Sequence, residues 1–421
     1  MRIALLAGTH SGCGKTTVML ALLQYLQARQ FQIRAFKTGP DFLDPLWHLA
    51  VTGKPSYNLD TEMIGIEQSR RLLGSVIDGE LALIEGVMGM FDGKAGVGQA
   101  GSSVDLARQL AVPVVLVVDA QGMAGSIAAM VAGYVDYARR CGVLVSGVVA
   151  NRVSGDFHAN LLREALADCG LPPLLAWLRK QERPLQERHL GLSMPTAASR
   201  LSDLELDLDL DEAALVEAFG EFAPVAVQPA QKPLLPGKTI AIARDGACCF
   251  VYPANVDWLR EQGAKVVYFS PLAGEPVPDA DALWLPGGYP ELHAGALAES
   301  TSLTSIKAFI ESGKPTLAEC GGAMLLGKAL IDQAGTTWPM ANVLPFVSRM
   351  QDSLAALGYR RETSGMRGHE FHFSVREWEV VATPAFVMDA GDCGIRYKNL
   401  RASYVHWYFA SAPAIAAQWL S

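Results

Sequence analysis

The stretch Ala7–Thr17 reads Ala-Gly-Thr-His-Ser-Gly-Cys-Gly-Lys-Thr-Thr and decides the fold of the first part of the chain. The apolar run Ile3–Leu6 before it is typical of a buried strand, and Val18–Leu23 after it is typical of a helix. A strand, a glycine-rich turn and a helix cradle phosphate, because backbone N–H groups and the positive end of the helix dipole point at the anion. The stretch therefore predicts a nucleotide-binding loop.

The loop differs by one residue from the plain motif, because five residues and not four separate Gly8 from Gly14. A glycine-rich turn that binds nothing is the alternative, but strand, turn, Lys-Thr pair and helix all agree on a phosphate site. Lys15 is expected to reach the β- and γ-phosphates of ATP, and the Thr16 hydroxyl to ligate Mg²⁺. The residues expected to bind ATP are Gly8, Thr9, Gly12, Gly14, Lys15, Thr16 and Thr17.

Length and composition bound the class of protein. The chain has 421 residues, enough for two or three domains, and 50% of them are hydrophobic, as in a globular protein. The longest apolar stretch, Leu110–Val118, is shorter than the ~20 residues of a membrane span, and the first strand begins too early for a signal peptide. A net charge of −8 without a basic run argues against a nucleic-acid partner. Seven scattered cysteines do not resemble a disulfide framework and indicate a reducing cytoplasm.

From residue 1 to about residue 195, apolar strands alternate with helical patterns. Repeated strand–helix units predict an α/β domain with a doubly wound parallel sheet, which binds ligands at the carboxyl ends of its strands. The expected strands are Ile3–Ala7, Ile33–Lys37, Leu81–Glu85, Val114–Val118 and Val143–Ala150, and the expected helices include Ile127–Arg139 and Ala159–Cys169.

Three turns after these strands carry unusual residues: Lys37–Pro45, Glu85–Gly93 and Asp119–Gly122. Taken singly, each acid in them would be a helix cap or a solvated loop residue. Taken together beside a phosphate loop, they predict a Mg²⁺–ATP site with a substrate pocket. Glu85 ends an apolar strand, where a carboxylate holds the metal of the nucleotide.

Within these turns, we divide the acids between two tasks. Glu85 and Asp41 are expected to work with Mg²⁺, together with Thr16. Asp44 and Asp92 are expected to lie nearer the substrate. The chain offers no Cys-x-x-Cys pair and no His-Glu-x-x-His motif, so neither structural zinc nor a catalytic transition metal is expected.

The character of the sequence changes in residues 196–237. Leu204–Asp211 alternates apolar and acidic residues, which favours a strand with one solvated face and not a metal site. Asp211 is placed to cap a helix that reaches Phe222. Four prolines follow between residues 224 and 236, as in an extended linker. We therefore predict one domain over 1–195, a linker over 196–237 and a second domain over 238–421.

The second domain begins a new series of strands and helices. The expected strands are Thr239–Ala243, Lys265–Phe269, Ala282–Leu285 and Pro315–Ala318. The turn after the fourth strand reads Ala-Glu-Cys-Gly-Gly and places Cys320 on a sharp strand-to-helix turn, where the dipole of the next helix favours a thiolate.

A late histidine completes the chemistry expected of this domain. Cys320 and His406 form a thiolate–imidazole pair if the fold brings them together. The backbone N–H groups of Gly288, in the turn Pro-Gly-Gly-Tyr-Pro-Glu, and of Gly321 would hold an oxyanion. The more ordinary role of a cysteine is that of a small buried hydrophobe, which we expect for Cys141, Cys169 and Cys393.

Four motifs of the first domain carry a family resemblance. They are Gly-Thr-x-Ser-Gly-x-Gly-Lys-Thr-Thr, Lys-x-Gly-Pro-Asp-x-x-Asp-Pro, Asn58-Leu59-Asp60 and Glu85-Gly-Val-Met-Gly-x-x-Asp. Together they resemble the cobyrinic acid a,c-diamide synthase family, whose counterpart for the metal-free ring, hydrogenobyrinic acid, shares them. The loop alone also resembles dethiobiotin synthetase, which has the same five-residue spacing. The resemblance implies that the acidic turns serve ATP, Mg²⁺ and the carboxylates of a corrinoid.

Residues 238–415 resemble the class I (triad) glutamine amidotransferase domain. The likeness lies in Pro-Gly-Gly-Tyr-Pro-Glu, Ala-Glu-Cys-Gly-Gly and the late histidine. The usual class I enzyme has a glutamate two residues after the histidine, and here that position is Tyr408. The motif Gly368–His372 also looks like that of the corrinoid amidases, but its residues have no role that the sequence reveals.

The two resemblances together imply one reaction. Glutamine would be hydrolysed at Cys320, and the ammonia would displace phosphate from a carboxylate that ATP has activated. The expected partners are a corrinoid, ATP and glutamine, with no nucleic acid and no membrane, in a cytoplasmic enzyme that forms a homodimer. Alternatives are a metal-free ring, cobyric acid synthase, Ni-sirohydrochlorin a,c-diamide synthase, or an ATPase switch resembling ParA with a degenerate glutaminase fold.

Overall fold

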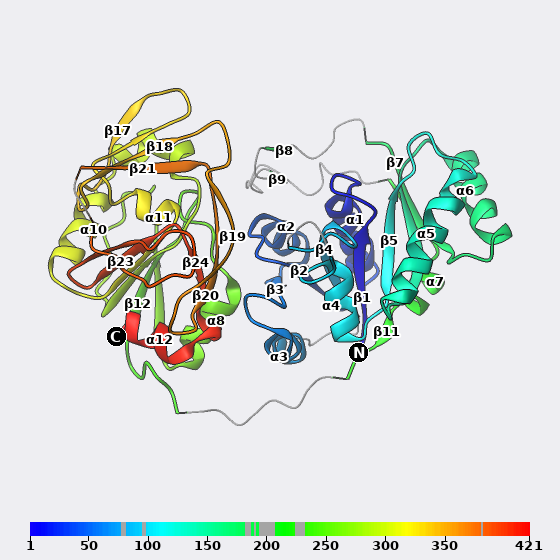
Figure 1. The fold of residues 1–421 in the computed structure, drawn as a ribbon, viewed down its shortest axis with the longest axis horizontal. Helices are drawn as coiled ribbons and strands as arrows, with labels where there is room; N and C mark the ends of the chain where they lie inside the picture. Colours follow the sequence, from blue (N-terminus) through cyan, green and yellow to red (C-terminus); the bar gives the residue numbers. More distant parts are fainter. Residues whose placement is uncertain are drawn as a thin grey trace. The chain divides into compact units, whose positions relative to one another are not determined.

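The chain forms two α/β units with mainly parallel sheets, as predicted (Figure 1). The computed structural model describes residues 1–76, 81–94, 98–181, 187–188, 191–192, 207–223, 232–379 and 382–421. Contacts divide the chain into Met1–Gln228 and Pro229–Ser421. Among the described residues, no helix is both long and apolar enough to cross a membrane.

The first unit is built on a sheet in which the described strands follow the order β10-β7-β6-β5-β1-β4-β2-β3, with β11 beside β1. The strands are parallel except β10 and β11, which run antiparallel to their neighbours. Their bounds are β1 Arg2–Gly8, β2 Ile33–Thr38, β3 Tyr57–Leu59, β4 Leu81–Gly89, β5 Val114–Asp119, β6 Val145–Val153, β7 Leu174–Arg179, β10 Leu208–Leu210 and β11 Gly220–Glu221; β8 Glu187–Arg188 pairs with β9 Gly191–Leu192 apart from this sheet.

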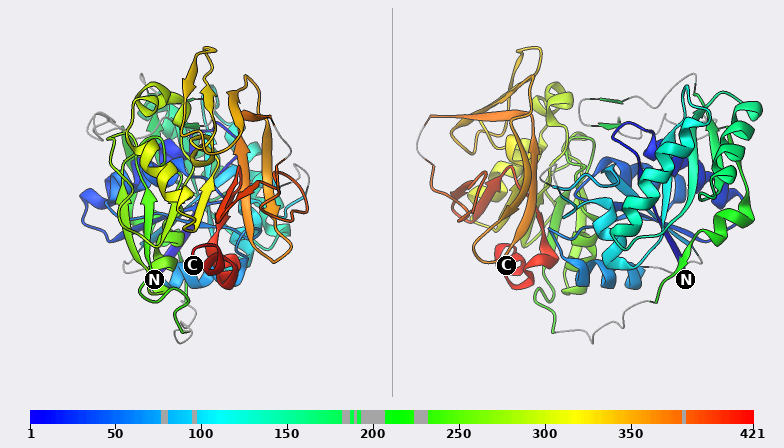
Figure 2. Two further views of the ribbon diagram at one scale, coloured as in Figure 1. Left: turned by 90° about the vertical axis from the view of Figure 1, so that its left-hand side faces the viewer. Right: turned by 45° about the vertical axis from the view of Figure 1, so that its right-hand side comes forward.

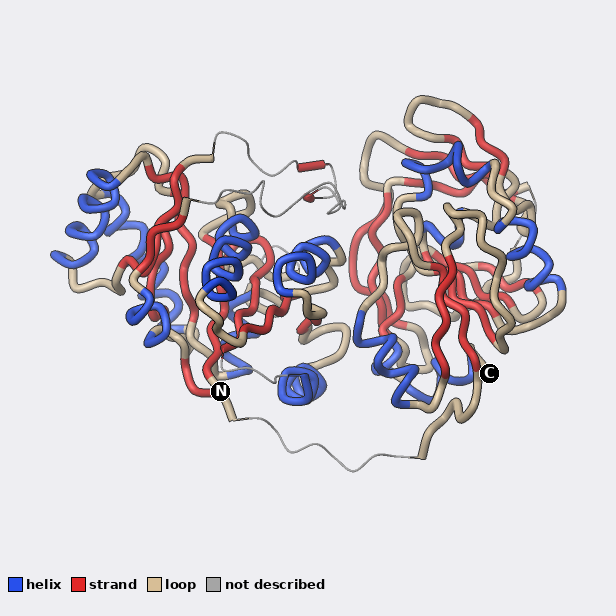
Figure 3. The backbone as a smooth tube through the Cα atoms, turned by 180° about the vertical axis from the view of Figure 1, so that it is seen from behind, coloured by secondary structure: helices blue, strands red, loops and turns tan. Residues whose placement is uncertain are grey.

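Helices cover both sides of this sheet, which explains why its central strands are apolar throughout (Figures 2 and 3). Six of the seven residues of β1 are buried, so the strand has no solvated face. The helices are α1 Lys15–Ala28, α2 Leu43–Thr52, α3 Ile66–Val76, α4 Ser103–Leu110, α5 Ser126–Arg140, α6 Asp156–Asp168 and α7 Glu212–Glu217.

All five predicted strands of this unit are present, four of them within three residues of the expected bounds. The fifth, β4, continues four residues beyond Glu85 to Gly89, so Glu85 does not end its strand and the first half of the predicted turn Glu85–Gly93 is strand. The turn predicted at Lys37–Pro45 is shorter than expected, because α2 begins at Leu43. Pro45 does not prevent this helix, since the first turn of a helix leaves its backbone N–H groups without helical partners.

Part of the predicted linker belongs to the first unit's sheet. β10 pairs with β7, and β11 pairs with β1, so residues 207–223 are built into the first unit. The Asp211 side chain accepts a hydrogen bond from the Ala214 N–H at 3.0 Å, which confirms the predicted cap. The helix that it caps ends at Glu217 and not at Phe222, because the chain then turns into β11. Residues 196–206 and 224–231 of the predicted linker lie outside the described residues, as do the first two of its four prolines.

The second unit contains three sheets among its described residues. The six-stranded sheet β13-β12-β14-β15-β23-β22 is parallel apart from β22, and the smaller sheets follow the orders β17-β16-β18-β21 and β19-β20-β24. The bounds are β12 Thr239–Ala243, β13 Lys265–Phe269, β14 Ala282–Leu285, β15 Thr316–Glu319, β16 Ala329–Ile331, β17 Thr337–Pro339, β18 Phe346–Met350, β19 Ala356–Arg361, β20 Arg367–His372, β21 Ser374–Trp378, β22 Ile395–Tyr397, β23 Leu400–Ser403 and β24 His406–Tyr408.

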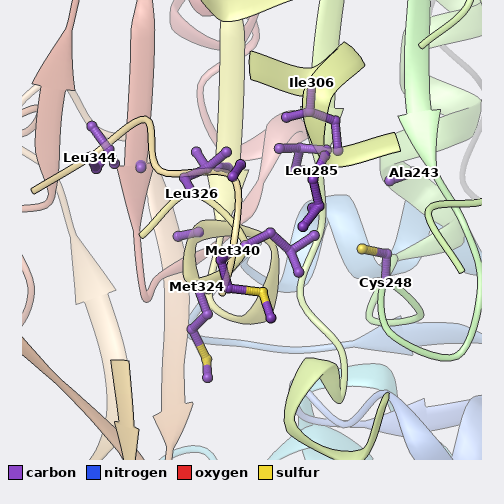
Figure 4. Close-up of a cluster of buried hydrophobic side chains, with 14 of the residues drawn as sticks. Ala243, Cys248, Leu285, Ile306, Met324, Leu326, Met340 and Leu344 are labelled. Carbon is purple, nitrogen blue, oxygen red and sulfur yellow. The ribbon is translucent and has the colours of Figure 1, made fainter. Parts of the chain in front are cut away.

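A buried core fixes the end of β15, where Cys320 follows. Leu285 of β14 and Ile306 of α10 pack in one cluster with Met324 of α11 and Leu326 (Figure 4). The helices of this unit are α8 Pro253–Glu261, α9 Ala294–Ala298, α10 Ser302–Glu311, α11 Gly321–Met324 and α12 Pro413–Trp419, with short 3₁₀ turns η2 Pro290–His293 and η3 Phe409–Ser411. The four predicted strands are confirmed, whereas the strands of the two small sheets were not predicted.

Candidate active sites

The predicted nucleotide-binding loop connects β1 to α1, and side chains approach two of its glycines closely. A methyl group on Gly8 would lie 2.3 Å from the Cys13 sulfur, and one on Gly14 would lie 2.0 Å from Nδ2 of Asn151. Gly14 also has a φ of 91°, a left-handed conformation that favours glycine. The residues expected to bind ATP lie at the end of β1, on this loop or in the first turn of α1: Gly8, Thr9, Gly12, Gly14, Lys15, Thr16 and Thr17.

A cluster of charged side chains joins the loop to β4 and β2. The Thr16 hydroxyl donates to Oε1 of Glu85 at 2.6 Å. Nζ of Lys37 lies 3.2 Å from the same oxygen of Glu85 and 2.5 Å from Oδ2 of Asp44, and it donates to the Gly86 carbonyl at 3.1 Å. The structure therefore brings Thr16, Glu85 and Asp44 together around Lys37. This lysine belongs to the motif Lys-x-Gly-Pro-Asp, but it is not among the predicted site residues.

The second oxygen of Glu85 is held by a histidine of α2. His48 is fully buried, its Nε2 lies 2.8 Å from Oε2 of Glu85, and its Nδ1 lies 2.9 Å from Oγ of Ser56. A neutral imidazole donates from one nitrogen only, so a ring that donates to Glu85 accepts from the Ser56 hydroxyl. These contacts fix both oxygens of a carboxylate that has no access to water.

Burial and neighbouring charges set the protonation of the two carboxyl groups. Burial opposes ionisation of Glu85, but the charge of Lys37 and the hydrogen bond from His48 lower its pKa to about 2. For Asp44, burial and the nearby carboxylates of Asp41 and Glu85 raise the pKa to about 8. Glu85 is therefore ionised at neutral pH, whereas the surroundings of Asp44 favour its protonated form more than those of an ordinary aspartate, despite Lys37 at 2.5 Å.

The two lysines respond in opposite directions. Burial disfavours the charged form of Lys37, but Asp44 and Glu85 outweigh it and raise the pKa of Lys37. For Lys15, burial is the main cause of a lowered pKa, and the positive charge of Lys37 adds to it. A negatively charged phosphate beside Lys15 would raise its pKa again, as expected of a lysine that binds a nucleotide phosphate.

The two remaining predicted acids make hydrogen bonds within their own turns. Oδ1 of Asp41 accepts from the N–H groups of Leu43 at 2.8 Å and Asp44 at 3.0 Å, at the start of α2. Oδ2 of Asp92 accepts from the Gly89 N–H at 2.8 Å. Each acid thus has the local role expected of it singly, and their roles toward metal and substrate stay predictions.

Two residues that were not predicted hold the loop from other elements. Nδ2 of Asn151, near the end of β6, donates to the Cys13 carbonyl at 3.0 Å. The Tyr134 hydroxyl, on α5, donates to the Thr9 carbonyl. Both contacts join residues more than a hundred positions apart, so no local pattern in the sequence announces them.

The donor set of the loop fits Mg²⁺ that arrives with a nucleotide. Among the described residues, no group of three or more His, Cys, Asp or Glu side chains is arranged to hold a metal ion by itself. The Thr16 hydroxyl and the ionised Glu85 carboxylate are hard oxygen donors, which Mg²⁺ prefers. Mg²⁺ at such loops takes its other ligands from phosphate oxygens and water.

In the second unit, Cys320 lies on the predicted strand-to-helix turn between β15 and α11. Its backbone has φ 44° and ψ −113°, a sparsely populated conformation for a residue with a side chain. A methyl group on Gly287 would lie 2.3 Å from Cε1 of His406 and 3.1 Å from Cβ of Cys320. The cysteine and the histidine, 86 residues apart in sequence, therefore converge over one glycine.

Gly288 and Gly321, the two residues predicted to bind the oxyanion, also lie next to each other. A methyl group on Gly321 would lie 2.9 Å from the backbone nitrogen of Gly288, and one on Gly288 would lie 2.2 Å from the Ala247 carbonyl oxygen. Only glycine permits both approaches. Their N–H groups as oxyanion donors stay a prediction.

The expected thiolate at Cys320 needs correction. Only 5% of Cys320 is exposed, and burial raises its pKa to about 12, which outweighs the hydrogen bond from the Gly321 backbone. The dipole of α11 is small, because that helix has only four residues. Burial and the neighbouring His369 and His372 lower the pKa of His406 to about 3. The resting pair is therefore a neutral thiol and a neutral imidazole.

The environment of His406 contains the motif to which the sequence assigned no role. Tyr408, at the position of the usual triad acid, is buried and its ring lies 5.7 Å from that of Tyr252. The motif Gly368–His372 lies on β20 beside β24, and its His369 is directly opposite His406. The motif thus forms the sheet that carries the histidine.

Glu370 of the same motif is buried and ionised. It is held by Arg360 and by Nε2 of His372 at 2.9 Å, and the His372 ring stacks on the Tyr404 ring at 3.6 Å. Burial opposes ionisation, but the hydrogen bonds from His372 and Arg360 lower the pKa of Glu370 to about 2.

Together, the two sites define a class of protein: a ligase that couples a nucleotide-binding unit to a cysteine-dependent glutaminase unit. Residues 4–183 match the family described as the CobQ/CobB/MinD/ParA nucleotide binding domain. Residues 239–414 match the CobB/CobQ-like glutamine amidotransferase domain. The chain is a glutamine-dependent amide ligase.

Full-length relatives narrow this class. The chain is 40% identical to cobyrinate a,c-diamide synthase of Herminiimonas arsenicoxydans, over 99% of this chain and 96% of the relative. It is 40% identical to hydrogenobyrinate a,c-diamide synthase of Stutzerimonas stutzeri, over 98% and 97%, and 35% identical to cobyrinate a,c-diamide synthase of Priestia megaterium, over 100% and 96%. The chain belongs to the family of cobyrinate and hydrogenobyrinate a,c-diamide synthases, which confirms the resemblance and favours the ligase over the ATPase switch.

Proposed function

We propose that this enzyme amidates the a and c acetate side chains of cobyrinic acid in cobalamin biosynthesis, with ATP and with ammonia released from glutamine. The proposal is supported chiefly by the presence of two arrangements of reactive side chains in one chain. One is the contact of Thr16 with Glu85 at the phosphate loop, and the other is the convergence of Cys320 and His406 over Gly287. The names of the relatives support the choice of substrate.

In the first unit, the carboxylate of the substrate must be activated, because it does not react with ammonia. Transfer of the γ-phosphoryl group from ATP gives an acyl phosphate, from which ammonia displaces phosphate. Lys15 and the buried Lys37 would stabilise negative charge on the transferred group. Asp44 and Asp92 would lie on the side of the substrate carboxylate.

Thr16, Glu85 and Asp41 would hold Mg²⁺ in this site. The ion supplies charge neutralisation at the phosphate oxygens when it is bound. The residues of the chain supply the rest: Thr16 and His48 orient the Glu85 carboxylate, and Asp41 holds the start of α2 beside it.

In the second unit, His406 takes the proton of Cys320 as the sulfur attacks the amide carbon of glutamine and a C–S bond forms. The N–H groups of Gly288 and Gly321 hold the oxyanion. His406 then gives the proton to the leaving nitrogen, the C–N bond breaks, and ammonia leaves a glutamyl thioester that water hydrolyses. Because thiol and imidazole are both neutral at rest, the proton moves during the attack and not before it.

Mass spectrometry of the products tests the proposal directly. The enzyme is incubated with ATP, Mg²⁺, glutamine and, separately, cobyrinic acid, hydrogenobyrinic acid or Ni-sirohydrochlorin. We expect a diamide from cobyrinic acid. If only another ring gives a diamide, that ring is the substrate in place of cobyrinic acid. If none of the three gives an amide, the assignment of the enzyme as a diamide synthase is wrong.

Two variants test the assignment of each step. Lys15→Ala is expected to lose amidation with glutamine and with ammonium chloride, because activation is lost, while it still hydrolyses glutamine. Cys320→Ala is expected to lose glutamine-driven amidation and to recover it with ammonium chloride, which enters after the thioester step. Retained glutamine-driven amidation in either variant would contradict the role of that residue.

We also propose that the enzyme acts in the cytoplasm on small molecules alone and forms a homodimer. Its seven free thiols support a reducing compartment. Light scattering of the purified protein measures the oligomeric state, and a mass equal to one chain would contradict the dimer.

A further inference from the structure

The strand that carries His406 has a strand neighbour on one side only. In the described sheet order β19-β20-β24, it lies at the edge and pairs with β20. Buried side chains take the place of a second neighbour. Oε1 of Glu319 accepts from the Trp407 N–H at 3.0 Å. Nδ2 of Asn255 donates to the Trp407 carbonyl at 2.7 Å, and its Oδ1 accepts from the Phe409 N–H at 2.9 Å.

The position of Glu319 gives its contact a direct bearing on the reacting pair. Glu319 is the last residue of β15 and immediately precedes Cys320, while Trp407 immediately follows His406. One hydrogen bond therefore joins the residue before the thiol to the residue after the imidazole. Both Glu319 and Trp407 are at most 1% exposed, so water cannot replace the contact.

The protonation of Glu319 suits it to this task. Burial raises the pKa of Glu319 to about 8, so the carboxyl group is neutral at pH 7. A neutral carboxyl accepts the Trp407 N–H without placing a charge beside the Cys320 thiol. A glutamine side chain offers the same carbonyl acceptor, which provides a conservative replacement.

We propose that Glu319 and Asn255 are positioning residues for His406, which fix β24 against the cysteine turn where Tyr408 has replaced the orienting acid. The inference rests on the proposed function, because it takes Cys320 and His406 as the reacting pair. Loss of the Glu319 acceptor would leave the Trp407 N–H buried without a partner, so the strand would shift and the imidazole would move with it. Glutamine binding would be little affected, because neither residue is placed at the substrate.

The experiment compares glutaminase kinetics in the full chain. Glu319→Met is expected to lower kcat for glutamine hydrolysis by roughly 10²-fold, as a displacement of about 1 Å does, with KM for glutamine unchanged. Glu319→Gln is expected to stay within about threefold of the wild type, because the acceptor is kept. Amidation driven by ammonium chloride is expected to be unchanged in both. Glu275→Met is the control for loss of a glutamate that accepts a backbone N–H, since Glu275 accepts from Ser270 at 2.7 Å in this unit, at an exposed position away from His406.

Three outcomes would overturn the inference: wild-type kcat in Glu319→Met, a loss in Glu319→Gln equal to that in Glu319→Met, or an equal loss in the Glu275 control. If Glu319→Met does not fold, Asn255→Asp decides, because it keeps the acceptor for Phe409 and loses the donor to Trp407. We expect a lower kcat at unchanged KM, and wild-type kcat would refute the role of the pair. Cys320→Ala distinguishes a failure of this inference from a failure of the proposed function. If Cys320→Ala still hydrolyses glutamine, Cys320 is not the nucleophile and the proposed glutaminase reaction itself is wrong.

Discussion

At the scale of single residues, the charge of Lys37 allows two carboxyl groups to lie buried at the end of the first unit's sheet. Its Nζ lies 2.5 Å from Asp44 and 3.2 Å from Glu85, and only 4% of its side chain is exposed. Removing one partner of a buried ion pair leaves an uncompensated charge and costs about 3–5 kcal/mol, whereas an exposed pair contributes about 0–1 kcal/mol.

Lys37→Met is therefore expected to lower the free energy of unfolding of the first unit by about 3–5 kcal/mol. Urea denaturation measures it, with hydrogen exchange assigning the loss to this unit. Lys94→Met is the control, because the Lys94 ion pair with Glu62 has a lysine side chain that is 47% exposed, and we expect no measurable change. If the two substitutions lower the free energy of unfolding equally, burial of the ion pairs of Lys37 does not account for the loss of stability.

The loop glycines differ in what surrounds them, which makes a second prediction at this scale. A methyl group at Gly14 meets Asn151, but one at Gly12 (φ 82°) meets nothing within 4 Å. Both substitutions strain the backbone by about 1–3 kcal/mol, and only Gly14→Ala adds a clash. We expect Gly14→Ala to weaken ATP binding by about tenfold or more relative to Gly12→Ala, measured by calorimetry. Equal affinities of the two variants would exclude the clash as a cause.

At the scale of elements, α2 links β4, the strand that carries Glu85, to the rest of the first unit. The helix places His48 against Glu85, and Ser56 after the helix holds the other ring nitrogen. The residues that orient a metal ligand commonly contribute about 10–100-fold to metal affinity. Under the proposed role of Glu85 as a Mg²⁺ ligand, we therefore expect α2 to influence Mg²⁺ affinity through the carboxylate that it orients.

His48→Leu is expected to raise the Mg²⁺ concentration for half-maximal amidation by about 10–100-fold, because Glu85 loses the partner of its second oxygen. The titration is run with ammonium chloride as the nitrogen source, so that the glutaminase unit does not enter. His158→Leu is the control, since His158 lies on α6 and contacts the carbonyl of Met123, in the turn before α5. An unchanged Mg²⁺ requirement in His48→Leu would show that the histidine does not act on the metal ligand.

The elements that the sequence predicted are those with local signals. Apolar runs with a polar turn at their carboxyl ends predicted β1, β2, β4, β5 and β6, and they also predicted the turn that carries Cys320. What remained unpredicted depends on distant pairing. The strand predicted within Leu204–Asp211 appears as β10, but β11 was not predicted: it is only two residues long and becomes a strand because it pairs with Arg2 and Ile3 at the start of β1.

The same distinction holds within the sites. The phosphate loop and the cysteine turn are contiguous motifs, so their residues were recognisable. Glu85 and Glu319 stand in such motifs, but their partners His48 and Trp407 are 37 and 88 residues away in the sequence, so no local pattern pairs them. The thiolate was wrong for a related reason, because a motif shows the helix that follows Cys320 but not the burial that raises its pKa.

At the scale of the whole molecule, buried titratable groups give the second unit its own pH dependence. The pKa values of Glu319 and Glu291 are raised to about 8 and about 7 by burial, from 4.5. Their contribution to stability is complete below pH 4.5 and is lost as the pH rises through these values. The pKa values of His406 and His369 are lowered to about 3 and about 4, from 6.5, chiefly by burial. Their contribution is present above pH 6.5 and is lost as the pH falls.

Between pH 4.5 and 6.5 these two slopes oppose each other, and between pH 6.5 and 8 only the carboxyl slope remains. We therefore expect the free energy of unfolding of the second unit to be nearly flat from pH 4.5 to 6.5 and to fall from pH 6.5 to 8. Urea titrations followed by tryptophan fluorescence measure it, because six of the eight tryptophans lie in this unit. Glu319→Gln removes one of the two carboxyl groups, so the fall above pH 6.5 should become shallower.

Glu311→Gln is the control. Contacts with Lys398 and Tyr397 lower the pKa of Glu311, so this carboxyl group changes the free energy of unfolding only at acid pH. A fall above pH 6.5 that Glu319→Gln leaves unchanged would mean that Glu319 is already ionised in the folded protein.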